Sequence, residues 1–197
     1  MKIKLLFISV ISLVVSCTSN TRQMDSSSME PTISRGEKIT IEKTETLKRQ
    51  DIIAFNYNDP STGKKQWAFR IIGIPGDTIQ IKHGALYVNG KLSKEPYSKL
   101  SDNLADSGTF QNDIFGSTKE NSWNTDNYGP IVIPLMGEVI KPDLIVNEKL
   151  YAGFLDKDRK IKQDLYFVLG DNRHDAYDSR FIGFIPKSEI AGVVKKE

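Results

Sequence analysis

Alternating polar and apolar residues indicate a series of short β-strands. Residues 38–43 alternate with a period of two, which is typical of a half-buried strand. Residues 52–55 are almost wholly apolar and predict a more deeply buried strand, and residues 66–74 predict a third strand that ends at Pro75-Gly76-Asp77. Asn89-Gly90 is a strong signal for a two-residue hairpin. Further strands are expected at residues 78–82, 85–88, 165–169 and 190–194.

The pattern changes between residues 95 and 160, which are polar and contain few periodic runs. A structureless loop of this length is uncommon inside a compact domain, so we predict that residues 95–160 form an inserted subdomain. The flanking residues 26–94 and 161–197 then form one core. The fold class expected is mainly β, an antiparallel β-barrel or sandwich with an insertion.

The N-terminus resembles an export signal. Met1 to Lys4 is basic, residues 5–15 are apolar, and a small residue precedes Cys17. The apolar run is too short for a comfortable membrane span of about 20 residues. Its end resembles a bacterial lipobox, so we expect a signal sequence over residues 1–16, a lipid on Cys17 and a polar tether over residues 17–25. An uncleaved signal anchor and an ordinary cleaved signal are the alternatives.

Composition narrows the chemistry. Cys17 is the single cysteine, so its lipidation would exclude disulfides, thiolate catalysis and cysteine-ligated metals together. We expect no metal and no cofactor. The net charge is +2 over 197 residues, and no basic stripe is interleaved with aromatics, so nucleic acid is not an expected partner.

Residues 26–32 are the candidate for serine chemistry. They read Ser-Ser-Ser-Met-Glu-Pro-Thr, a polar turn closed by a proline. A serine run beside a linker is more often solvated than nucleophilic, so the remaining chain must supply a base, an oxyanion donor and a scaffold. Four segments in order are relevant here: Ser26-x-Ser28-Met29-x-Pro31-Thr32; Arg49-x-Asp51-Ile52-Ile53-x-Phe55; Arg70-Ile71-Ile72-Gly73-Ile74-Pro75-Gly76-Asp77; and Gly170-Asp171-Asn172-Arg173 through Asp178-Ser179-Arg180-x-x-Gly183-x-Ile185-Pro186.

Together these segments resemble bacterial signal peptidase I, the S26 serine peptidases, over roughly residues 26–92 and 163–194. The resemblance implies that Ser28 is the nucleophile. It also implies that the Ser26 hydroxyl and the Ser28 backbone N–H stabilise the oxyanion. Four further residues correspond to family residues that pair charges behind the site: Arg70, Asp171, Asp178 and Arg180.

The match departs from the family at the general base. The family has a lysine immediately before the arginine of the third segment, and here that residue is Phe69. The family serine that hydrogen-bonds this lysine aligns with Ala176. Both halves of one hydrogen bond are therefore replaced by apolar side chains.

Two lysines and two histidines are other residues that could act as a base. Lys65 shares strand parity with position 69 but lies about 13 Å away at ~3.3 Å per residue, and Lys64 points to the other face. His174 lies on the loop expected to border the site, and an imidazole is a good base near neutral pH. It is the candidate substitute, against an exposed loop histidine as the alternative. His83, at a hairpin tip, is expected to be structural or exposed.

Two functions follow from the resemblance. One is a membrane-associated serine endopeptidase acting on signal-peptide-bearing preproteins outside the cytoplasmic membrane. The other, favoured by Phe69 and Ala176, is a catalytically inactive lipoprotein of the same fold that binds extended peptide segments. A structural surface lipoprotein whose inserted subdomain binds a partner is a third alternative.

Overall fold

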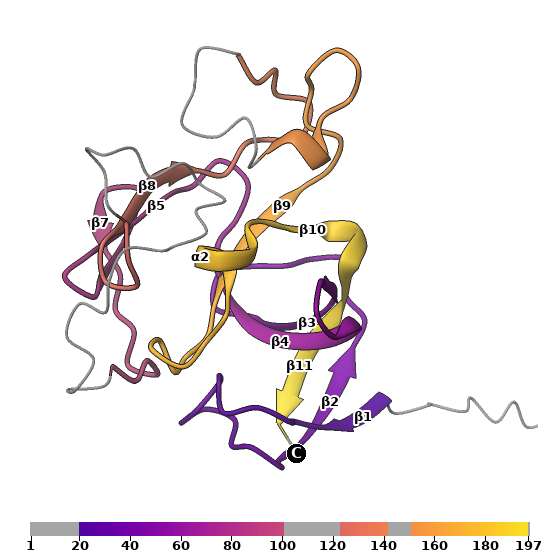
Figure 1. Cartoon of the computed structure of the whole chain (residues 1–197), viewed down its shortest axis with the longest axis vertical. Coiled ribbons are helices and arrows are strands. Elements are labelled where there is room, and N and C mark those ends of the chain that lie inside the picture. The colour runs from indigo at the N-terminus through magenta and orange to yellow at the C-terminus, as the bar shows by residue number, and fades with distance from the viewer. Residues whose placement is uncertain (1–19, 101–122, 142–150, 197) are drawn as a thin grey trace, which may run out of the picture.

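A computed structural model describes residues 20–100, 123–141 and 151–196 of the chain (Figure 1). Within these residues no helix is long and apolar enough to cross a membrane. The predicted signal sequence and Cys17 lie outside the described residues.

The larger of two sheets has seven strands in the order β1-β2-β11-β3-β4-β9-β10, and its named pairs are all antiparallel. The alternating run of residues 38–43 forms β2, in which Ile39 and Ile41 are buried and their neighbours are not. The strands are β1 (Asn20–Gln23), β2 (Lys38–Glu42), β3 (Ile52–Asp59), β4 (Gly63–Gly73), β9 (Leu165–Leu169), β10 (Ile185–Pro186) and β11 (Ile190–Lys196).

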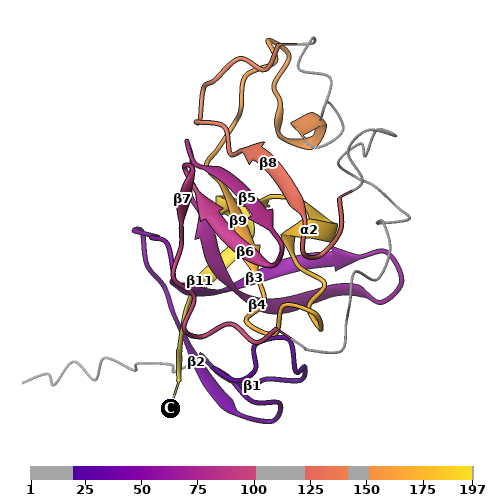
Figure 2. The ribbon, with the colours of Figure 1, turned by 90° about the vertical axis from the view of Figure 1, so that its left-hand side faces the viewer.

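The smaller sheet has the order β7-β6-β5-β8. Figures 1 and 2 place it at the opposite end of the molecule from β1 and β2. Its strands are β5 (Thr78–Lys82), β6 (Ala85–Val88), β7 (Lys91–Leu92) and β8 (Tyr128–Val132). The helical elements are short: η2 (Ala152–Phe154), α2 (Ser179–Ile182) and η3 (Lys187–Glu189).

The prediction of a mainly β, antiparallel fold is confirmed, and each strand expected from the sequence is present. The Asn89-Gly90 hairpin is confirmed as well, since both residues have positive φ (52° and 73°), as a type I′ turn requires. β3, β4 and β11 are longer than expected, and β3 and β4 are so because their pairing continues outward to the turn between Asp59 and Gly63.

Part of the predicted tether and part of the predicted inserted subdomain form strands of the two sheets. Residues 20–23 of the predicted tether form β1, which pairs with β2. β8 comes from the segment predicted as an inserted subdomain, yet it pairs with β5 in the smaller sheet. The described part of residues 95–160 is therefore joined to the core through this strand.

Two buried clusters flank the strands that carry the candidate site. One surrounds the larger sheet and includes Met29, Phe55 and Phe69. The other lies beneath the smaller sheet and includes Ile79 and Phe167. β4 and β9 contribute to both clusters, and the candidate site lies on the side of the first cluster, to which Met29, Phe69 and Ala176 belong.

Candidate active site

The Ser28 loop follows β1 and is fastened to the segment after β9. The Asn172 backbone N–H donates to the Ser28 carbonyl (3.0 Å), and the Asn172 side-chain amide donates to the Ser27 carbonyl (3.2 Å). Met29, the next residue, is fully buried. The first and fourth sequence motifs are thereby brought together.

Ser28 and Ser26 form a hydroxyl pair. Their Oγ atoms are 2.8 Å apart, which is a normal hydrogen-bond distance. Ser28 is 8% exposed and Ser26 is half-buried. The hydroxyl of Ser27, between them, instead donates to the Asp175 carboxylate at 2.5 Å. Only the two predicted serines therefore share one local site.

The predicted base position adjoins Ser28 but is apolar. Phe69 and Ala176 are 4% and 8% exposed. A Cβ atom added at Gly170 would overlap the Ala176 Cβ, and would lie 2.6 Å from the Ser28 carbonyl oxygen and 3.4 Å from Phe69 Cε1. The ring, the methyl group and the Ser28 backbone thus converge on Gly170, where a side chain would not fit.

A pocket of about 660 Å³ opens beside this point. It lies between β4 and the segment that leads from β1 to Ser28. The lysines at positions 64 and 65 line it, but the β3–β4 register is unbroken from Ile52↔Arg70 to Asp59↔Gly63. No bulge therefore brings Lys65 closer to position 69. Lining residues include Met24, Asp25, Ser26, Ser28, Ile39, Ile41, Lys64, Lys65, Trp67, Phe69, Asp175 and Tyr177.

The candidate substitute base His174 lies in a different environment. Its Nε2 atom is 2.9 Å from Asp126 Oδ1, and its side chain is buried. It is not among the residues that line the Ser28 pocket. His83 is exposed at its turn, as expected. The role of His174 as a base stays a prediction.

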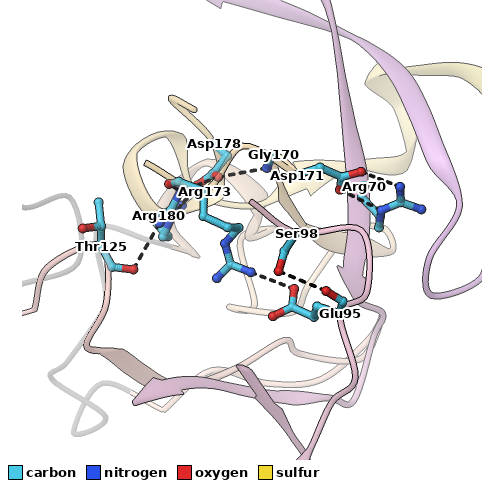
Figure 3. A network of polar contacts seen from close by, with 9 residues as sticks. All are labelled: Arg70, Glu95, Ser98, Thr125, Gly170, Asp171, Arg173, Asp178 and Arg180. Carbon is cyan, nitrogen blue, oxygen red and sulfur yellow. Dashed lines mark hydrogen bonds and ion pairs between the residues drawn. The ribbon is translucent and has the colours of Figure 1, made fainter. Parts of the chain in front are cut away.

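The four predicted supporting charges form two buried ion pairs (Figure 3). Arg70 grips Asp171 through Nε (2.8 Å) and a terminal nitrogen (2.5 Å). Arg180 likewise donates to the two carboxylate oxygens of Asp178 through Nε and a terminal nitrogen, both at 2.8 Å. Such bidentate pairs fix orientation as well as charge.

These pairs hold the loops rather than touch the serines. Asp178 Oδ2 accepts the Gly170 backbone N–H at 3.0 Å. Asp171 also accepts the hydroxyl of Thr32, which ends the first motif. The carboxylates therefore connect β4, the Ser28 loop and the turn after β9.

Sequence reasoning missed a third buried pair in this network. Glu95 Oε1 is 2.7 Å from a terminal nitrogen of Arg173 (Figure 3). Burial raises the pKa of Glu95 and lowers that of Arg173, since it penalises both charged forms. Nearby, the Tyr97 ring lies 3.9 Å from the Arg70 guanidinium. Glu95 and Tyr97 fall in a stretch without a periodic pattern, so the sequence around them gave no indication of these contacts.

Among the described residues no group of three or more His, Cys, Asp or Glu side chains is arranged to hold a metal ion.

Comparison with known proteins adds a family. The family model described as "Signal peptidase, peptidase S26" matches residues 1–196. Signal peptidase I of Bacillus amyloliquefaciens is 31% identical over 178 residues, which cover 87% of this chain and 71% of that protein. Probable signal peptidase I-2 of Synechocystis is 29% identical over 181 residues, covering 88% and 60%.

The chain is also similar to two further proteins. Signal peptidase I of Streptococcus pneumoniae is 30% identical over 177 residues, covering 90% of this chain and 80% of that protein. A crystal structure of a signal peptidase I from Enterococcus faecalis matches with 27% identity and a TM-score of 0.38, covering 77% of this chain and 98% of that chain.

Proposed function

We propose that this chain, which belongs to the signal peptidase family of S26 peptidases, is a slow serine endopeptidase. It would act on exported preproteins at the outer side of the cytoplasmic membrane. The observation that carries the proposal is the Ser26–Ser28 hydroxyl pair, 2.8 Å apart and beside an open pocket.

The roles follow from the chemistry of acyl transfer. Ser28 Oγ attacks the carbonyl carbon of the scissile peptide bond, and the Ser28 backbone N–H and Ser26 hydroxyl donate to the oxygen that becomes negative. The Ser28 proton passes to water, because Phe69 occupies the position from which a lysine would accept it. When the tetrahedral intermediate collapses, the C–N bond breaks and the amine leaves with a proton from water, and a second water molecule then hydrolyses the Ser28 ester. A positioned general base accelerates such a reaction roughly 10²–10⁴-fold, so turnover is expected to be slower by about that factor than with a lysine at position 69.

The geometry of β4 favours an extended peptide as ligand. β4 pairs with β3 from Gly63 to Arg70, but its pairing with β9 begins only at Arg70. Within the described residues, the opposite edge of residues 64–69 has no strand partner and borders the Ser28 pocket. Peptides bind such edges by adding a strand through main-chain hydrogen bonds.

We also propose that the chain is exported and anchored by a lipid on Cys17. Arg22 lines the pocket and follows Cys17 by five residues, which span at most about 18 Å when fully extended. A lipid at Cys17 would therefore keep the pocket close to the membrane in which signal peptides reside. A Cys17→Ala variant is expected to lose lipid labelling, and labelling that persists would contradict the anchor.

The second candidate function is peptide binding without turnover. It is favoured by Phe69 and Ala176, two apolar side chains packed against Gly170 where the family has a hydrogen-bonded lysine and serine. The peptide edge of β4 does not depend on these residues being catalytic. Binding can therefore persist where cleavage has been lost.

One experiment separates the two candidates. The full chain is purified in detergent and incubated with a preprotein carrying a signal peptide, beside Ser28→Ala and the neighbouring-serine control Ser27→Ala. Cleavage that is lost only in Ser28→Ala supports the endopeptidase. Binding of the preprotein without cleavage by any form supports the binding protein. A parallel His174→Ala variant tests the predicted base, and unchanged turnover would exclude it.

A further inference from the structure

An aromatic wall lines the pocket beside Ser28. It consists of Trp67 and Phe69 on β4 and Tyr177 on the turn after β9, and all three residues border the pocket. The Trp67 and Phe69 rings have centroids 6.0 Å apart at 80°, and the Trp67 and Tyr177 rings are 6.3 Å apart at 76°. These are edge-to-face contacts, the arrangement that aromatic rings favour.

The wall runs from the core to the surface. Phe69 is buried, Trp67 is half-buried, and Tyr177 is 53% exposed. Tyr177 nevertheless has a fixed neighbour, because it stacks on Phe181 at 4.9 Å and 25°. A large exposed ring that is already held by stacking loses little freedom when a ligand contacts it.

The identity of residue 69 sets the chemistry of this wall. A lysine there would place an ammonium group beside the Trp67 ring, whereas Phe69 adds a third aromatic ring to the wall. The neighbouring lining residues Ile39, Ile41 and Ala54 are apolar too. The pocket volume of about 660 Å³ remains after these rings have taken their space, which is far more than a methyl group fills.

We propose that Trp67, Phe69 and Tyr177 form a subsite that takes a large aromatic side chain of an extended peptide bound along the free edge of β4. This proposal rests on the proposed function for the peptide itself and adds the class of side chain that is selected. The replacement of a lysine by Phe69 then has a positive consequence, since it completes an aromatic subsite.

The magnitude can be bounded. Full burial of a phenyl side chain is worth about 1.5–3 kcal/mol, and 1.4 kcal/mol corresponds to a factor of ten in affinity. A peptide with phenylalanine at the matching position is therefore expected to bind about 10-fold to 100-fold more tightly than one with alanine there.

The chain offers a reporter in the subsite itself. It has two tryptophans, and Trp123 is buried in the other core cluster. In a Trp123→Phe background, fluorescence reports on Trp67 alone. The probes are capped hexapeptides of alanine and glycine, either without an aromatic residue or with one phenylalanine at each position in turn.

The expected result is tight binding for one phenylalanine position and a loss of that preference in Tyr177→Ala. Tyr87→Ala, a tyrosine on the smaller sheet, is the matched control and should keep the preference. Because Tyr177 is largely exposed, its truncation should leave the melting temperature nearly unchanged, which is checked by circular dichroism.

Two outcomes would overturn the proposal. One is equal affinity for the phenylalanine and alanine peptides. The other is a response of Trp67 to laurate, a straight acyl chain, without any response to the peptides. In the parent chain, preference without cleavage would refute the endopeptidase alone, while cleavage without preference would refute the subsite alone.

Discussion

Restoring the general base is the most direct test of how this site works. We expect the double variant Phe69→Lys/Ala176→Ser to cleave preproteins about 10²–10⁴-fold faster than the parent chain, the range that a positioned base provides. At 1.36 kcal/mol per tenfold, this corresponds to about 2.7–5.4 kcal/mol of the activation barrier. The reason is geometric, since both positions converge with Ser28 on Gly170.

The same burial that excludes water would tune the new lysine. Taking an ammonium group out of water disfavours its charged form and lowers its pKa, so the amine becomes a usable base near neutral pH. The introduced serine hydroxyl provides a hydrogen-bond partner in the otherwise apolar corner. The rate of the double variant should therefore rise with pH as the amine loses its proton.

The substitution also has a cost in stability. Phe69 is 4% exposed, and its ring lies 6.0 Å from those of Phe55 and Trp67. Removing a buried phenyl ring costs about 3–5 kcal/mol, and the lysine methylenes recover part of this, so we expect a loss near the lower end. That is tolerable within a typical stability of 5–15 kcal/mol, but the melting temperature must fall.

The assay compares initial cleavage rates at 25 °C with thermal melting of the same samples. Phe69→Met/Ala176→Ser is the matched control, because it has a flexible side chain of similar length but no base. Adding Ser28→Ala to the lysine variant should abolish the gain. A folded lysine variant that stays as slow as the parent between pH 6 and pH 9 would refute the reasoning.

Three other predictions concern the scaffold. Gly170→Ala should displace the Ser28 loop and abolish peptide cleavage or binding, because its Cβ would lie 2.6 Å from the Ser28 carbonyl oxygen; unaltered function would contradict the packing. Arg180→Met should lower the free energy of unfolding by about 3–5 kcal/mol, since it leaves buried Asp178 unpaired, and chemical denaturation measures this. Burial opposes ionisation of Asp77, but hydrogen bonds, chiefly from the Arg49 guanidinium, still hold its pKa below 3.8. Its contribution to stability is therefore complete above pH 3.8 and lost as the pH falls further, so the melting-temperature difference between the parent chain and Asp77→Asn should be largest near neutral pH and shrink in acid.

The strands were predictable because their signals are local. Alternation in residues 38–43 and the turn chemistry of Asn89-Gly90 each involve neighbours in the sequence, and both appear in the structure. β8 was not predicted as part of the smaller sheet, because its partner β5 lies about fifty residues earlier. The inner residues of β8, Tyr128 and Ile131, are buried in the cluster beneath the smaller sheet, where the Tyr128 ring packs against the rings of Trp123 and Phe167.

In the candidate site, too, some features were predictable from local sequence and others were not. The motifs pointed to the Ser28 loop and to the charged residues around it, but not to the Glu95–Arg173 pair, because an isolated glutamate in a polar stretch carries no local signature. His174 shows the converse. Its position on the bordering loop suggested a base, but the direction of its side chain depends on Asp126, 48 residues away.

The sequence by itself determined the strand periodicity, the four motifs and the presence of phenylalanine at position 69, because each is a property of residue identity and close spacing. The tertiary structure alone decided what those residues face. It packs Phe69 and Ala176 against Gly170 beside Ser28, turns His174 toward Asp126, and continues Phe69 into an aromatic wall with Trp67 and Tyr177. Such contacts join side chains that are distant in the sequence, and only the packing of the folded chain sets their distances.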